Sequence, residues 1–471
     1  MDSEFDVIVI GAGPAGEVLA GRIGEGAEKS VVIVERELVG GECSYYACMP
    51  SKALLRPAEI LSEAARIPGA AEAVTGELDV AAVLERRDQI VNDLDDSNQV
   101  PWLEARNVEL VRGAGRLEGE RKVRVGERLL SARDAVVIAV GTGAAMPPIP
   151  GLDQVGAWSN REITTSKQVP GHLIILGGGV VGVEMAQAWS SLGAKVTVVE
   201  AESRLLPREE PYVGEELAEA LRGHGVDVRV GISAVGAERG GEEVTLRLSD
   251  GQAVTGDRLL VAVGRKPLTE DLGLESVGLE SGGYIEVDDQ LRVADQPWLY
   301  AIGDANGRSL LTHSGKYQGR LAADHILGAD VAAVHDGEGA PRVVFTDPQV
   351  AAVGLTLERA REQGVDAVAV DLPTSGSAGG SFYGRNAAGT TRFVVDADRQ
   401  VIVGATFVGP EVGDMLQAAT IAVVAEVPLS TLAHAIAPFP TRSELWLKFL
   451  EAYEQARPEA EVHSRRLTPA S

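Results

Sequence analysis

Two copies of one local pattern constrain the fold of this chain more than any other feature. The β-branched run DVIVI (6–10) leads into the glycine turn GAGPAG (11–16), a stretch of helical character and a second apolar run. The same order returns at LIIL (173–176) and GGGVVG (177–182), again followed by a helical stretch and an apolar run. This repetition predicts two Rossmann-like units that bind dinucleotides.

Each position in such a turn has a physical role. The first glycine permits the tight turn, the second lets backbone approach a pyrophosphate, and the third lets the helix pack on the strand. These glycines are Gly11, Gly13 and Gly16 in the first copy and Gly177, Gly179 and Gly182 in the second. An acid ends each copy, Glu35 after 24 residues and Glu200 after 23, placed to accept hydrogen bonds from ribose hydroxyls. Because a carboxylate repels a 2′-phosphate, Glu200 predicts NAD(H) rather than NADP(H) in the second site.

Further glycine turns follow later apolar runs. Gly141 follows AVVIAV and Gly264 follows RLLVAV, and each turn is expected to close one dinucleotide unit. In LYAIGDA (299–305), Asp304 follows a buried-looking strand and a glycine. This acid is either a ligand for a cofactor hydroxyl or a simple turn residue.

The length of 471 residues suggests about three domains. From about residue 340 the pattern changes to short alternating runs followed by helical segments, which predicts an α+β domain. We therefore expect an α/β protein with two Rossmann-like dinucleotide-binding domains and a C-terminal α+β domain. The expected boundaries are 1–150 with 270–338 for the first dinucleotide-binding domain, 151–269 for the second, 339–456 for the α+β domain, and 457–471 for a polar, mobile tail.

Charge and hydropathy exclude some classes of partner. The formal net charge of -26 argues against a nucleic-acid-binding protein or one held on an anionic membrane. The first residues, MDSEFD, are acidic where a secretory signal is basic, and no apolar run is long enough to span a membrane. We expect a cytoplasmic protein.

The only cysteines are Cys43 and Cys48, in GGECSYYACMPSKALL (40–55) beside the first glycine turn. In isolation such a pair would be read as two buried small hydrophobic residues. Here Pro50 is expected to begin a helix just after Cys48. The helix dipole and nearby Lys52 would both lower the pKa of that thiol. These surroundings favour a redox-active disulfide.

Over residues 5 to about 450 the chain resembles the pyridine nucleotide-disulfide oxidoreductases, especially the branch with dihydrolipoamide dehydrogenase and mercuric reductase. The motifs that carry the resemblance are GGxC and CxPSK around the cysteines, GRKP at 264–267, YAIGD at 300–304, VVFTDPQVAAVG at 343–354 and PTRSE at 440–444.

The resemblance implies a homodimer that binds FAD in the first site and NAD(H) in the second. It thus makes 1–150 with 270–338 the FAD-binding domain, 151–269 the NAD-binding domain and 339–456 a C-terminal α+β dimerisation domain. It implies that Cys48 lies nearer the flavin, that Cys43 is the interchange thiol, and that Lys52 pairs with Glu184. Residues expected at the cofactors also include Glu35 on the adenosine ribose, Asp304 on the ribityl chain, and Gly41, Gly141 and Gly264.

Two departures from the family limit the functional expectation. Relatives that act on small thiols carry Asn and Gly between the cysteines, where this chain has Ser44, Tyr45, Tyr46 and Ala47. Their C-terminal motif begins with an acid–base His, oriented by a Glu. Here Phe439 takes the place of the His, although Glu444 remains. His434 lies five residues upstream as a possible substitute, and the C-terminal cysteine pair of mercury-detoxifying relatives is absent.

These observations leave several hypotheses open. The leading one is an NADH-dependent flavoprotein whose Cys43–Cys48 disulfide passes electrons to a disulfide, or to another acceptor that needs little proton transfer, such as a metal ion or a quinone. The first rival is a true dihydrolipoamide dehydrogenase that uses His434 or water as its base. A rival of another class is a non-catalytic redox sensor or a flavoprotein that docks on a larger complex.

Overall fold

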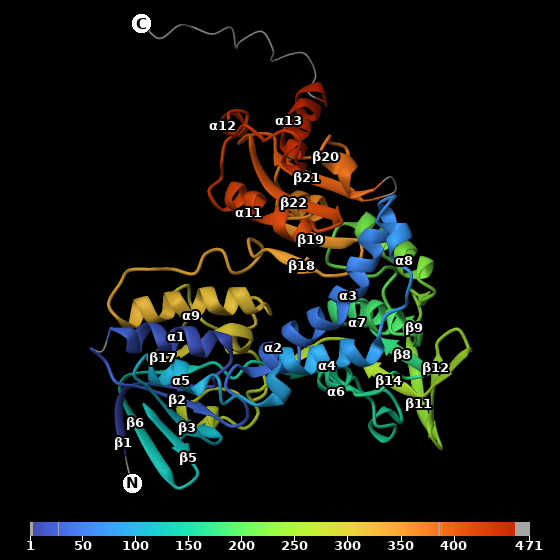
Figure 1. Ribbon diagram of the computed structural model, residues 1–471. Coiled ribbons are helices and arrows are strands. Elements are labelled where there is room, and N and C mark those ends of the chain that lie inside the picture. Colours follow the sequence, from blue (N-terminus) through green and yellow to red (C-terminus); the bar gives the residue numbers. More distant parts are fainter. Residues whose placement is uncertain (1–2, 27, 385–386, 388, 457–471) are drawn as a thin grey trace, which may run out of the picture. The chain divides into compact units, whose positions relative to one another are not determined.

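The computed structural model describes residues 3–26, 28–384, 387 and 389–456 (Figure 1). It divides into two compact units. The first comprises Met1–Ile60, Gly76–Pro207 and Leu217–Ala340, and the second comprises Leu61–Thr75, Arg208–Glu216 and Pro341–Ser471. The expected tail, 457–471, lies outside the described residues. The boundary expected within the first unit, between an FAD and an NAD domain, stays a prediction.

The main sheet of the first unit is built on the first glycine-turn pattern. Its strands run in the order β16-β17-β6-β1-β2-β3, with β4 and β5 attached through β6. The bounds are β1 Ser3–Ile10, β2 Val31–Glu35, β3 Val108–Arg112, β4 Gly115–Leu117, β5 Lys122–Val125, β6 Arg128–Ile138, β16 Arg292–Val293 and β17 Gln296–Ala301. β3, β2, β1, β6 and β17 are parallel neighbours.

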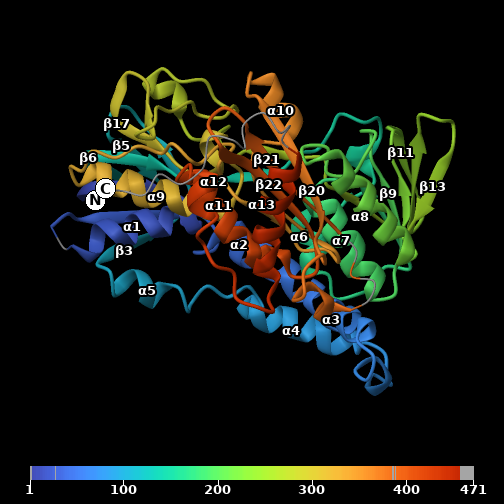
Figure 2. The ribbon, with the colours of Figure 1, turned by 90° about the horizontal axis from the view of Figure 1, so that it is seen from above.

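Burial on both faces explains the continuous apolar run in β1. Val7 and Val9 pack in one core with residues of α1 (Pro14–Glu25) and α9 (Thr312–Ile326). Ile8 and Ile10 point into a second core on the other face of the sheet. Figures 1 and 2 both show α1 and α9 lying side by side. Along the chain, β2 is followed by α2 Gly41–Tyr45, α3 Cys48–Arg66, α4 Val80–Ile90 and α5 Val100–Glu104, which precede β3.

The second glycine turn follows β8, which belongs to a separate sheet in the same unit. The strands of this sheet run in the order β10-β9-β8-β14. The bounds are β8 His172–Leu176, β9 Lys195–Val199, β10 Asp227–Arg229 and β14 Arg258–Val261, with α6 Asn160–Thr165, α7 Val180–Ser191 and α8 Pro211–Gly223. An antiparallel sheet follows, formed by β11 Ala234–Gly240, β12 Glu243–Leu248 and β13 Ala253–Gly256, and β7 Thr142–Ala144 pairs with β15 Arg265–Pro267.

The second unit is the α+β element expected from the sequence. Its antiparallel sheet runs β18-β19-β22-β21-β20, and Phe393 on β21 stacks on Phe449 of α13 at 4.3 Å between ring centroids. The bounds are β18 Arg342–Val344, β19 Gln349–Gly354, β20 Ala367–Pro373, β21 Thr390–Asp396 and β22 Val401–Gly409, with α10 Leu357–Glu362, α11 Leu416–Val424, α12 Leu429–Leu432 and α13 Leu445–Ala456.

One local expectation is wrong. The helix after the redox pair does not start at Pro50, because Cys48 is already its first residue. Proline is tolerated in a first helical turn, where its missing N–H would have no intrahelical acceptor. Among the described residues, no helix is both long enough and apolar enough to cross a membrane.

Candidate active site

The first glycine turn has the close packing that its sequence requires. Gly11 has φ 105°, and a Cβ there would lie 2.4 Å from the carbonyl oxygen of Ala139. A Cβ on Gly16 would lie 2.1 Å from the carbonyl oxygen of Gly11. Gly13, by contrast, has no atom within 4 Å of such a Cβ. The turn is therefore closed toward the sheet and open at the position where a pyrophosphate would approach.

The second turn repeats this geometry. Gly177 has φ 113°, and its Cβ would lie 2.4 Å from the carbonyl oxygen of Ala262. A Cβ on Gly182 would lie 2.0 Å from the carbonyl oxygen of Gly177, while Gly179 again faces open space. Both turns therefore keep room for a ligand at the N-terminus of a helix, α1 in one case and α7 in the other.

Glu35 is held at the end of β2 by backbone donors. The Ala12 amide donates to Glu35 Oε2 at 2.7 Å, and the Glu37 amide donates to Oε1 at 2.7 Å. The residue is only 8% exposed. Each oxygen keeps a lone pair, so the carboxylate is fixed in direction and still able to accept a bond from a hydroxyl.

Glu200 is held in the same way beside the second turn. Both Gly178 and Glu202 donate their amides to it, the latter at 2.7 Å. Arg204, the cation that could soften a preference against a 2′-phosphate, donates to the carbonyl oxygen of Pro207 at 3.0 Å. This hydrogen bond joins one end of the guanidinium to its own loop, and Nε is buried with no hydrogen-bond partner among the described residues.

The two cysteines lie together at the junction of α2 and α3. Both thiols are free and partly buried, and Cys48 Sγ lies 3.5 Å from Thr312 Oγ1 at the start of α9. The hydrogen bond from Cys43, together with Thr312 and Lys52, lowers the pKa of Cys48 to about 6. The same bond to Cys48, with burial, raises the pKa of Cys43. Cys48 is therefore the thiol of the pair that ionises first.

Lys52 and Glu184 form an ion pair next to these thiols. Lys52 Nζ lies 2.7 Å from Glu184 Oε2 and 3.0 Å from Oε1. The Glu184 side chain is 3% exposed and that of Lys52 33%. This is the pairing that the family resemblance implies.

Asp304 follows β17 at a glycine with φ 66°, Gly303. Thr142 Oγ1 donates to its Oδ2 at 2.6 Å, and Arg265 Nε lies 3.7 Å from the same oxygen. Burial raises the pKa of this carboxyl, against the influence of Thr142 and Arg265.

The remaining predicted glycines occupy sites that a side chain would strain or block. Gly41 has φ 60°, and its Cβ would lie 2.9 Å from the Cα of Gly13. The redox loop, which we define as residues 40–48 including the short helix α2, therefore packs directly on the first turn. Gly141 and Gly264 have φ 70° and 148° and face open space.

Several residues near the cysteines were not identified from the sequence. Thr312 contacts Cys48 from 264 positions away, and no spacing rule signals that contact. Glu17, in the first turn of α1, is partly buried, and the resulting desolvation raises its pKa to about 7, with Lys316 opposing the shift and Glu35 adding to it. Glu42 is bound by Asn160 and Arg161 of α6. For this last contact, the sequence offered one sign, which is that a charged residue, Glu42, directly precedes Cys43.

The C-terminal residues that depart from the family lie in the second unit. Phe439 is 76% exposed, and His434 is exposed as well. Oε2 of Glu444 is buried and has no hydrogen-bond partner within the described chain. This oxygen is therefore an unsatisfied hydrogen-bond acceptor.

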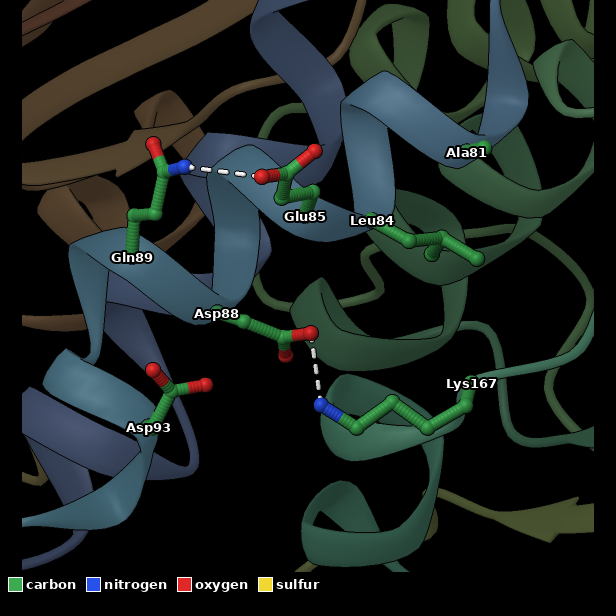
Figure 3. A pocket seen from close by; sticks show the side chains of 7 residues that line it. All are labelled: Ala81, Leu84, Glu85, Asp88, Gln89, Asp93 and Lys167. Atoms are coloured by element: carbon green, nitrogen blue, oxygen red, sulfur yellow. Dashed lines mark hydrogen bonds and ion pairs between the residues drawn. The ribbon is translucent and has the colours of Figure 1, made fainter.

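A hollow of about 500 Å³ lies at α4, away from the predicted residues (Figure 3). It is lined by Ala81, Leu84, Glu85, Asp88, Gln89, Asp93 and Lys167, and Asp88 pairs with Lys167 at 2.5 Å. Among the residues that the structure describes, no group of His, Cys, Asp and Glu is arranged to hold a metal ion.

Comparison with known families gives two matches along the chain. Residues 5–319 match the model of the pyridine nucleotide-disulphide oxidoreductases, and residues 340–448 match that of their dimerisation domain. Dihydrolipoyl dehydrogenase of Thermus scotoductus is 34% identical over 457 residues, 95% of this chain and 97% of that protein. Mercuric reductase of Staphylococcus aureus is 30% identical over 449 residues, 94% of this chain and 81% of that protein.

Solved structures give the same result. The Cu(II) complex of RclA, an HOCl-induced flavoprotein disulfide reductase from Escherichia coli, superposes with a TM-score of 0.84 at 27% identity, covering 95% of this chain and 99% of that one. LpdA from Mycobacterium tuberculosis superposes with a TM-score of 0.83 at 25% identity, covering 97% of this chain and 100% of that one.

Proposed function

Because the chain belongs to the pyridine nucleotide-disulphide oxidoreductases, FAD-dependent enzymes that use NAD(P)H, we propose that it passes electrons from NADH through a Cys43–Cys48 disulfide to an acceptor needing little proton transfer. The observation that carries this proposal is the pair of thiols between Thr312 and the ion pair of Lys52 with Glu184. The dimerisation domain supports a homodimer.

The residues present fit the two dinucleotides. The open positions at Gly13 and Gly179 would admit the pyrophosphates of FAD and of NADH, and Glu35 and Glu200 would orient the adenosine riboses. Asp304 would bind the ribityl chain of FAD. When bound, FAD would supply the chemistry that takes a hydride from NADH and delivers an electron pair to the disulfide.

The two thiols would then have different roles. The electron pair opens the Cys43–Cys48 bond, leaving Cys48 as the thiolate that Lys52 and Thr312 favour. Cys43 loses its proton to water and attacks a disulfide acceptor, which breaks the acceptor's S–S bond, forms a mixed disulfide and releases one acceptor thiolate. Cys48 then attacks the Cys43 sulfur, which restores the Cys43–Cys48 bond and releases the second acceptor thiolate. An acceptor whose thiols leave as anions needs no general acid.

The absence of a His at position 439 supports this choice of acceptor. Losing general acid–base help costs about 10²- to 10⁴-fold for a thiol substrate. A dihydrolipoamide dehydrogenase that works through His434 or water is therefore the less favoured candidate. A metal ion is a second candidate, because the RclA structure that this chain resembles is a Cu(II) complex.

Steady-state NADH oxidation by the purified flavoprotein, screened over aromatic disulfides, quinones, Cu(II) and lipoamide, tests the proposal. We expect turnover with disulfides of low thiol pKa and poor turnover with lipoamide. If no acceptor supports NADH oxidation, the proposal is wrong and the hypothesis of a non-catalytic redox sensor replaces it.

A further inference from the structure

The residue before the interchange cysteine is bound by a helix from elsewhere in the chain. Glu42 accepts a hydrogen bond from Asn160 Nδ2 at 2.7 Å and one from Arg161 Nε at 2.5 Å. The same guanidinium reaches Glu37 through Nη2 at 2.9 Å. Arg161 therefore bridges two carboxylates, one of them adjacent to Cys43.

The other flank of the loop is held by the same helix, α6. The guanidinium of Arg161 lies 4.5 Å from the ring centroid of Tyr46. The carbonyl oxygen of Tyr46 accepts from Asn160 Nδ2 at 3.0 Å and from Thr164 Oγ1 at 3.1 Å. Contacts from α6 thus fix positions 42 and 46, on either side of Cys43.

α6 is itself held by hydrogen bonds from α4. Arg87 of α4, fully buried, donates to the carbonyl oxygens of Thr164 and Ser166, the latter at 3.0 Å. Figure 3 shows the adjoining ion pair of Asp88 with Lys167. Because these contacts hold the end of α6 in place, the backbone at Arg161 loses little conformational entropy when its side chain binds the redox loop.

We propose that Arg161 is a positioning residue for the redox disulfide, which holds Cys43 for attack on a disulfide acceptor and neutralises the carboxylate of Glu42 beside it. The inference rests on the proposed function. The planar guanidinium bonds two carboxylates and stacks on a ring at the same time, which an ammonium group does not do. Without it, an uncompensated Glu42 charge would oppose formation of the Cys43 thiolate.

This role predicts that Arg161 matters for the reduction of disulfide acceptors and not for the reduction of quinones. A disulfide must be attacked by Cys43, so its reduction depends on where the loop holds that sulfur. A quinone would take electrons directly from bound FAD, without reaction at the thiols. Loss of Arg161 should therefore affect the first activity and spare the second.

The test uses FAD-loaded enzyme and the variant Arg161→Gln, with Arg258→Gln as the matched control. Arg258 also stacks on an aromatic ring, that of Trp158, at 5.5 Å, and no described contact joins it to the redox loop. We expect Arg161→Gln to lower kcat/KM for an aromatic disulfide by about 10- to 100-fold, the scale of a small misplacement of reacting atoms. Quinone reduction should be unchanged from wild type, because it does not depend on the position of the Cys43 sulfur.

A second readout does not depend on turnover. In NADH-reduced protein, alkylation of Cys43 by iodoacetamide should be about 3- to 10-fold slower in Arg161→Gln, because a negative charge on the preceding residue, no longer paired with a cation, disfavours the thiolate. The double variant Glu42→Gln/Arg161→Gln should recover most of the alkylation rate. A residue that merely stabilised the fold would give no such recovery.

Equal losses with disulfide and quinone, an unchanged disulfide kcat/KM, or no recovery in the double variant would each overturn the proposal. If Arg161→Gln does not retain FAD, Arg161→Lys replaces it, and the same split between acceptors is required. Failure of the proposed function would show itself separately, because wild-type enzyme would then reduce no disulfide at all.

Discussion

Lys52 Nζ lies 2.7 Å from Glu184 Oε2, although 132 residues separate the two along the chain. The contact joins α3, which starts at Cys48, to α7, which starts at the second glycine turn. It thereby connects the redox pair with the nucleotide turn through one ion pair whose acid is almost fully buried.

Removing the cation of this pair should destabilise the protein. Lys52→Met removes the cation from beside the buried Glu184 carboxylate, which we expect to cost about 2 kcal/mol after allowing for the partial exposure of Lys52. Lys448→Met is the matched control, because Lys448 and Glu451 are 46% and 47% exposed. That change should cost less than about 1 kcal/mol. Urea unfolding of the holoprotein measures both, and equal losses would contradict the account.

Nucleotide choice should follow from Glu200. We expect kcat/KM for NADH to exceed that for NADPH by about tenfold or more, equal to about 1.4 kcal/mol, because the carboxylate repels a 2′-phosphate. Glu200→Ala should narrow the ratio, whereas Glu35→Ala, at the equivalent place in the first turn, should leave it unchanged. Equal values for the two nucleotides in wild-type enzyme would show that Glu200 does not face the ribose.

The two cysteines should differ spectroscopically. Reduction by NADH should give a thiolate-to-flavin charge-transfer absorbance that Cys48→Ser abolishes and Cys43→Ser keeps. Because the pKa of Cys48 is lowered to about 6, its thiolate is present above that pH and is protonated as the pH falls through it. The band should therefore fade on acidification through about pH 6. Identical behaviour of the two single variants would contradict the assignment.

Phe439→His should restore part of the missing thiol chemistry. The Oε2 atom of Glu444 has no hydrogen-bond partner in the described chain and is thus available to orient an imidazole. Dihydrolipoamide oxidation should rise by about tenfold or more, a part of the 10²- to 10⁴-fold that acid–base catalysis supplies. Phe439→Ala should leave quinone activity unaffected. Fast lipoamide turnover by wild-type enzyme, unchanged in His434→Ala, would contradict this explanation.

The sequence was sufficient to predict the elements that local rules determine. Glycine spacing predicted both turns, and the acid after each second strand lies where the pattern put it, because a tight turn and a parallel pair leave few alternatives. The α+β character of the second unit was also predicted correctly, from its short alternating strands.

Contacts made across the fold could not be predicted in this way. Thr312 and Arg161 meet the redox loop from α9 and α6, and no periodicity relates their positions to Cys48 or Glu42. The start of α3 at Cys48 was missed because proline marks the first turn of a helix without specifying its first residue. The antiparallel sheet of β11, β12 and β13 was missed as well.

The most direct test of the central claim is a thiol count during anaerobic titration of the purified flavoprotein with NADH. The chain contains two cysteines, so a redox-active Cys43–Cys48 disulfide predicts that two new thiols per chain appear with the first equivalent of NADH. Cys43→Ser should give no increase. Bleaching of the flavin without the appearance of any thiol in wild-type protein would contradict the account.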